Sequence, residues 1–136
     1  MREGTFIIFA FENSTNRLKE ILDRYQINTN DTGIRDAVIQ RFEFTYSIAL
    51  KTLNKYLMEY SFIPIKQLSF NEMIRTANQL DLLKSNLEKW TEFREMRNLT
   101  SHTYDEEVAE KVVRIVPDFY EEISFLLQKL KDTQNG

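Results

Sequence analysis

Residues 108–130 have the sequence VAEKVVRIVPDFYEEISFLLQKL, in which apolar side chains recur at intervals of three and four positions. An α-helix has 3.6 residues per turn, so this spacing gathers them on one face and predicts a long amphipathic helix. Asp105 is the expected N-cap of that helix. Glu106 and Glu107 follow in its first turn, where acidic side chains are favoured. The apolar positions are Val108, Val112, Ile115, Phe119, Ile123, Leu126 and Leu130.

Two further long helices are expected earlier in the chain, over about residues 6–25 and from about residues 31–34 to Tyr60, with a turn at residues 27–33 between them. The second would be roughly 40 Å long. Only the core of a bundle or a dimer interface supports so long a helix. The expected inner face of the first is Ile7, Phe11, Ser14, Leu18, Ile21 and Tyr25, and that of the second is Ile34, Val38, Phe42, Thr45, Ala49, Leu53 and Tyr56.

Shorter patterns complete the chain. Ser69 followed by Glu72 predicts a capping box that opens a short helix ending near Gln79. A further helix is expected from Asn86 to about His102, with connections at residues 61–68 and 80–85. Short connections make successive helices antiparallel neighbours. We therefore predict one all-α domain over residues 1–136, an antiparallel up-and-down four-helix bundle with one additional short helix.

Composition excludes several classes of protein. The chain contains no cysteine, which excludes disulfides, thiolate nucleophiles and cysteine-bound zinc. A net charge of −3 argues against broad, non-specific nucleic-acid binding. The longest apolar run, residues 6–11, is six residues long, whereas about 20 are needed to span a bilayer. We expect a cytoplasmic protein that has no membrane segment.

Residues 97–104, RNLTSHTY, contain the only histidine of the chain, His102, with Arg97 five positions before it and Tyr104 two after it. Imidazole exchanges protons near neutral pH, and a guanidinium binds phosphate oxygens. On an ideal helix, however, Arg97 and His102 point about 140° apart. Either the helix ends or bends near Ser101, or a second copy of the chain supplies the missing half of the site.

These residue types suit metal-independent RNA cleavage, in which a ribose 2′-hydroxyl attacks the adjacent phosphate. Asn98, one helical turn from His102, is expected to fix the imidazole tautomer. No metal site and no cofactor are expected. A simpler interpretation is also open, because a single histidine near a helix end is usually a helix cap or a hydrogen-bonded surface residue. Aromatic side chains are likewise more often core or dimer interface than platforms for bases; they are Phe42, Phe44, Tyr46 and Trp90.

Residues 39–46 (IQRFEFTY), the Lys89-Trp90 pair and residues 97–104 resemble the nucleotidyltransferase substrate-binding protein family of the HEPN group. The resemblance covers nearly the whole chain. It implies a helical bundle that forms a homodimer, and a separate minimal nucleotidyltransferase encoded beside it as partner. The chain resembles, too, the helical domain attached to kanamycin nucleotidyltransferase.

The resemblance also implies roles for individual residues. Arg97, Asn98 and His102 match the motif of the metal-independent ribonucleases of the HEPN group. Tyr104 matches the tyrosine to which the partner transferase adds AMP in toxin–antitoxin pairs, silencing the ribonuclease. Ser47 stands where the family more often has an acidic residue, which leaves the role of Glu43 open. Candidate substrate-binding residues are Arg94, Ser101, Arg41 and Glu43.

Three hypotheses follow. The chain is an endoribonuclease toxin whose site forms between two copies, or a non-catalytic subunit that presents substrate or nucleotide to the transferase. In the third, it is a structural dimer in which Arg97 and His102 only stabilise the interface. We favour the first hypothesis, in which this chain is the partner of a minimal nucleotidyltransferase and is itself a ribonuclease.

Overall fold

The computed structural model describes residues 3–60 and 68–135. Within them the chain forms α-helices and one short 3₁₀ turn, with no strand, which confirms the predicted all-α class. The connection predicted at residues 61–68 lies almost wholly outside the described residues, as does the side chain of Ile7. The elements are α1 (Glu3–Ile27), α2 (Thr32–Tyr60), α3 (Phe70–Gln79), α4 (Leu87–Leu99), η1 (Thr100–His102) and α5 (Glu106–Asn135).

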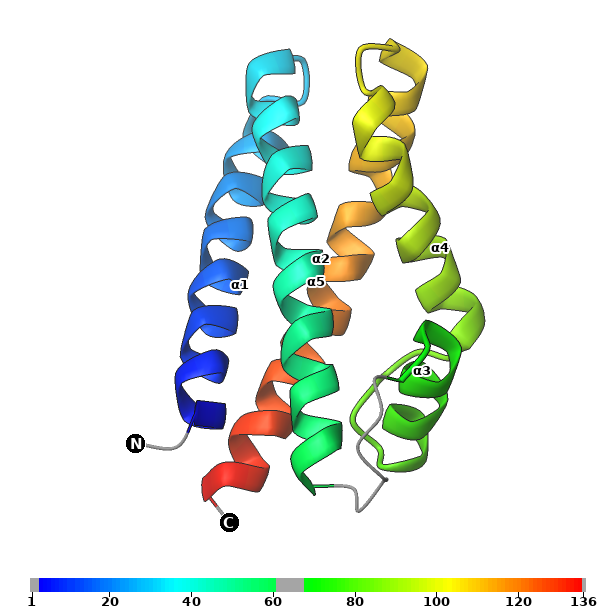
Figure 1. The fold of residues 1–136 in the computed structure, drawn as a ribbon. Helices are drawn as coiled ribbons and strands as arrows, with labels where there is room; N and C mark the ends of the chain where they lie inside the picture. Colours follow the sequence, from blue (N-terminus) through cyan, green and yellow to red (C-terminus); the bar gives the residue numbers. More distant parts are fainter. Residues whose placement is uncertain (1–2, 61–67, 136) are drawn as a thin grey trace.

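The four long helices alternate in direction, and the short helix α3 lies at one end of the bundle, beside the start of α4 (Figure 1). α1 and α2 form an antiparallel pair, α4 lies on the other side of α2, and α5 runs behind α2. Both termini lie at the end that carries α3. The turn between α4 and α5 is at the opposite end, together with the turn between α1 and α2. No helix of the described part is long and apolar enough to cross a membrane.

Side-chain caps set where several helices begin. Ser69 accepts a hydrogen bond from the backbone N of Glu72, and the Glu72 carboxylate accepts one from the Ser69 backbone, so the predicted capping box is confirmed. Asn86 caps α4 through a 3.1 Å bond from the Lys89 backbone N. Asp105 accepts a 2.9 Å bond from the backbone N of Glu107 and opens α5, as predicted.

The core centres on Phe119 of α5. Its ring packs against Phe42 of α2 at 4.9 Å, and against Phe93 and Trp90 of α4 at 5.4 and 6.4 Å, all close to edge-to-face. These four side chains are fully buried. The predicted apolar faces of α2 and α5 point inward along most of their length; Val38, Phe42, Ala49, Leu53, Val112, Phe119, Ile123, Leu126 and Leu130 are each fully buried.

One boundary differs from the prediction. The fourth helix was expected to continue to about His102, but α4 ends at Leu99 and η1 follows. The Thr100 backbone N and hydroxyl both donate to the Arg97 carbonyl, the hydroxyl at 2.7 Å. The Ser101 hydroxyl donates to the Asn98 carbonyl at 3.3 Å. Bonds to carbonyls three residues back favour the tighter 3₁₀ turn over continued α-helix.

Candidate functional site

Arg97 lies in the last turn of α4 and is held in place by α2 and η1. Its Nη2 lies 3.6 Å from Oε1 of Glu43, and its Nη1 donates to the Thr100 hydroxyl at 3.4 Å. The Arg97 side chain is 32% exposed, so part of the guanidinium still faces solvent. Glu43, whose role was open, is therefore the counter-ion of Arg97. The ion pair directs the arginine without burying it.

His102 ends η1 and lies on the surface. Its Nδ1 is 3.4 Å from the Tyr104 hydroxyl, and the two rings meet nearly edge to face at 5.9 Å. Tyr104 itself is 83% exposed. The predicted hydrogen bond from Asn98 to the imidazole is not formed within the single chain. In the described part of the chain the Asn98 side chain makes no hydrogen bond with the ring, because the 3₁₀ turn rotates residue 102 away from residue 98.

The motif residues thus fall into two sets of contacts within the single chain. Arg97 interacts with Glu43 and Thr100, whereas His102 interacts with Tyr104. The helix does end before Ser101, as one alternative required. Within the residues described, however, no hydrogen bond or ion pair joins the guanidinium to the imidazole. A shared cleft between two copies stays a prediction.

Tyr46 of α2 belongs to the same surroundings, although its sequence context suggested only core or dimer interface. It lies one turn after Glu43 and is 7% exposed. Burial raises the pKa of Tyr46 to about 12, and the positive charges of Arg94 and Arg97 oppose that rise. Burial therefore outweighs the two positive charges in setting the pKa of this phenol. No spacing or composition in the sequence distinguishes this tyrosine from an ordinary core residue.

Among the described residues, the other candidate substrate-binding residues make no hydrogen bond or ion pair with the side chains of Arg97 or His102. Arg94 is exposed and its guanidinium stacks over the Phe70 ring at 4.9 Å, which joins α4 to the start of α3. Ser101 is exposed, with its hydroxyl directed to a backbone carbonyl. Arg41 precedes Glu43 by two residues, so the two differ by about 200° around α2 and do not share a face.

A buried arginine holds the start of α5, directly after Tyr104. The side chain of Arg35 is 3% exposed and binds Glu106 at 2.6 Å, Glu110 at 3.1 Å and Asp36 at 3.1 Å. These bonds raise the pKa of Arg35 above its ordinary value, chiefly through Glu106, and lower the pKa of Glu106. No sequence pattern indicated this cluster, because its charged residues have the spacing of an ordinary solvated helix surface.

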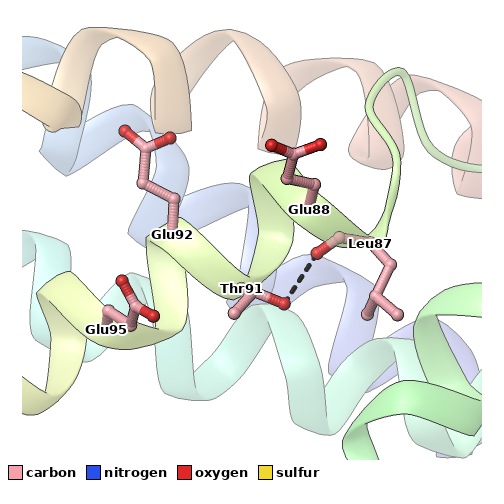
Figure 2. A pocket seen from close by; sticks show the side chains of 5 residues that line it. All are labelled: Leu87, Glu88, Thr91, Glu92 and Glu95. Atoms are coloured by element: carbon pink, nitrogen blue, oxygen red, sulfur yellow. Dashed lines mark hydrogen bonds between the residues drawn. The ribbon is translucent and has the colours of Figure 1, made fainter.

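A hollow of about 530 Å³ lies along α4, lined by Leu87, Glu88, Thr91, Glu92 and Glu95. Figure 2 shows its carboxylates on successive turns, with the Thr91 hydroxyl donating to the Leu87 carbonyl at 2.8 Å. Carboxylates repel phosphates, so this hollow does not suit RNA. Among the described residues, no three histidine, aspartate or glutamate side chains gather in a way that would hold a metal ion.

The family model described as nucleotidyltransferase substrate binding protein like matches residues 8–132. The chain belongs to this family. The assignment made from residues 39–46 and 97–104 is therefore confirmed. The matched region contains every candidate site residue, from Arg41 to Tyr104.

Comparisons with individual proteins agree with this family assignment. The chain is 34% identical over 128 residues to the protein named probable ribonuclease HepT from Haemophilus influenzae, covering 90% of this chain and 87% of that protein. The solved structure of HI0074 from Haemophilus influenzae, described as the fold of a substrate binding domain of a nucleotidyltransferase, superposes with a TM-score of 0.83. That comparison has 29% identity and covers 91% and 98% of the two chains. A protein from Thermus thermophilus superposes with a TM-score of 0.73 at 31% identity, covering 88% and 98%.

Proposed function

We propose that this protein is the helical partner of a separate minimal nucleotidyltransferase and a metal-independent endoribonuclease that acts as a homodimer. The observation that carries the proposal is the Arg97–His102 motif, in which a half-buried Arg97 in the last turn of α4 is paired with Glu43 of α2 and an exposed His102 ends the turn that follows. The names of the relatives support both halves, since one is a probable ribonuclease and another a substrate binding domain of a nucleotidyltransferase.

In this mechanism two copies bring Arg97 and His102 to one phosphodiester. The imidazole of one copy takes the proton of the ribose 2′-hydroxyl as its oxygen attacks the phosphorus. The guanidinium, already directed by Glu43, stabilises the charge that develops on the phosphoryl oxygens. The 5′-oxygen then leaves with its bonding electrons and takes a proton from solvent, while the imidazolium returns its proton to solvent. The products are a 2′,3′-cyclic phosphate and a 5′-hydroxyl end.

Silencing is proposed to occur at Tyr104, to whose hydroxyl the partner transferase adds AMP. That hydroxyl is accessible, because Tyr104 is 83% exposed, and it lies 3.4 Å from the imidazole. An adenylyl group at this position would occupy the space that the RNA needs.

Cleavage of RNA by the purified protein in the presence of EDTA tests the nuclease. Replacing His102 by alanine should abolish cutting while light scattering still reports a dimer. Arg97→Ala should do the same, and Arg75→Ala is the matched control, an exposed arginine on α3 at the opposite end of the bundle. Equal RNA loss with wild type and His102→Ala would refute the nuclease proposal.

The alternative is a non-catalytic subunit that presents substrate or nucleotide to the transferase. The specific observations in its favour are the acidic hollow on α4 and the pairing of Arg97 with Glu43, both of which weaken attraction for RNA. Co-purification with a transferase encoded in the neighbouring reading frame, without RNA cleavage, would support this reading. This alternative fails if no such transferase binds the protein, and the partner half of the first proposal then fails with it.

A further inference from the structure

The turn between α4 and α5 presents an acid–base pair of side chains. His102 Nδ1 lies 3.4 Å from the Tyr104 hydroxyl, and both residues are exposed. The backbone between them is held, since the Thr103 hydroxyl donates to the Thr100 carbonyl at 3.4 Å and the Asp105 N–H donates to the His102 carbonyl at 3.1 Å. The hydrogen bonds of the turn therefore hold the imidazole and the phenol next to each other.

The nearest acidic side chains in the sequence already have other partners. The Asp105 carboxylate accepts from the Glu107 backbone N at 2.9 Å, and Glu106 is paired with Arg35 at 2.6 Å. Of the basic groups in the described residues, His102 is the one in contact with the Tyr104 hydroxyl. A phenol is a weak nucleophile while it carries its proton, so its oxygen needs a neighbouring base to become a good one.

We propose that His102 is the general base for the modification of Tyr104, in addition to its part in RNA cleavage. The Tyr104 oxygen attacks the α-phosphorus of a nucleoside triphosphate held by the partner transferase, and an oxygen–phosphorus bond forms. The bond from the α-phosphorus to the oxygen bridging to the β-phosphate breaks, and pyrophosphate leaves with the electron pair. The phenolic proton moves to Nδ1 of His102. This inference rests on the proposed function.

The consequence is that one imidazole serves two opposite reactions. The group that takes a proton from the ribose hydroxyl during cutting takes a proton from Tyr104 during silencing. The product then has a phosphodiester oxygen where the phenol stood, next to the same ring nitrogen. A protein that loses the base by mutation thus loses both toxicity and the capacity to be silenced.

The test is the rate of AMP transfer to the dimeric protein by its transferase with ATP and magnesium, followed by intact-protein mass spectrometry. His102→Ala should slow transfer by about 100-fold or more, the usual contribution of a general base. His102→Gln, which keeps a hydrogen-bond acceptor but takes no proton near neutral pH, should be equally slow. Added imidazole should restore much of the rate to His102→Ala, and substituted imidazoles should do so in order of their basicity.

Two results would overturn the inference while leaving the proposed function intact: transfer to His102→Ala at the wild-type rate, or a loss that imidazole does not restore. Thermal unfolding monitored by circular dichroism checks that His102→Ala and His102→Gln are folded. Tyr104→Phe should block transfer completely. Failure of wild type to accept AMP, or acceptance by Tyr104→Phe, would instead overturn the proposed silencing and the present inference together.

Discussion

The Nη2 atom of Arg97 lies 3.6 Å from Oε1 of Glu43, so an ion pair joins the last turn of α4 to the middle of α2. The two side chains are 32% and 39% exposed, and an ion pair so hydrated contributes little to stability. The ion pair orients the guanidinium of Arg97 toward α2, in the last turn of α4 before η1 and His102. Because of this contact between helices, Arg97 has a fixed orientation, which an unpaired surface arginine would lack.

Glu43→Gln is expected to impair function more than folding. Without the carboxylate the guanidinium loses its orientation, and RNA cleavage should fall by about ten- to a hundred-fold. The free energy of unfolding should change by less than about 1 kcal/mol. Asp23→Asn is the control, since it breaks an exposed ion pair of 2.9 Å with Lys19 on α1 and should leave cleavage unchanged. Wild-type cleavage by Glu43→Gln would show that Glu43 does not position Arg97.

Arg35→Met should destabilise the start of α5. The substitution keeps much of the buried volume but removes the bonds to Glu106, Glu110 and Asp36. Because those carboxylates face solvent and can be hydrated again, we expect a loss of roughly 1–2 kcal/mol, measured by urea unfolding at pH 7. Hydrogen exchange should quicken in the first turn of α5. Unchanged stability and exchange would mean that the cluster does not hold this turn.

The same variant should alter the response to acid. Arg35 lowers the pKa of Glu106 below the ordinary value near 4.3. The stabilisation is therefore fully present above that ordinary value and is lost as the pH falls through the lowered pKa of the folded state. Wild type should lose stability more steeply than Arg35→Met below about pH 4.3. Parallel stability curves for the two proteins from pH 7 to 3 would contradict this coupling.

Tyr46→Phe should reduce alkaline unfolding. Burial raises the pKa of Tyr46 to about 12, so the folded state favours the neutral phenol. This contribution is fully present below the ordinary pKa of about 10 and is lost as the pH rises through about 12. The variant should lose less stability than wild type over that interval in urea titrations. Tyr104→Phe is the control, because its side chain is 83% exposed.

Phe119→Ala tests the centre of the core. The ring contacts Phe42, Phe93 and Trp90, and its removal should cost about 3–5 kcal/mol. Trp90 is the only tryptophan, so its fluorescence reports the cavity directly. Phe44→Ala is the matched control, with a ring that is 52% exposed, and should change stability by about 0.5 kcal/mol or less. Equal losses from the two substitutions would contradict the assigned core.

Much of the scaffold follows from the sequence by itself. The periodic spacing from Val108 to Leu130 determines both the helix and its buried face, because 3.6 residues per turn is a local property of the backbone. The caps at Ser69 and Asp105 are local for the same reason, since each side chain binds a backbone group two or three residues away. The motif RNLTSHTY likewise indicated the family before any fold was known.

Only the tertiary structure decided how the motif residues are held. Glu43 lies more than fifty positions before Arg97, and Arg35 lies 71 positions before Glu106, so no local pattern pairs them. The end of α4 at Leu99 is a local event by contrast, since the Thr100 hydroxyl binds a carbonyl three residues back, and the helical spacing alone did not reveal it. Periodicity determines which face of a helix is apolar, whereas the partner of a charged side chain depends on which helices pack together.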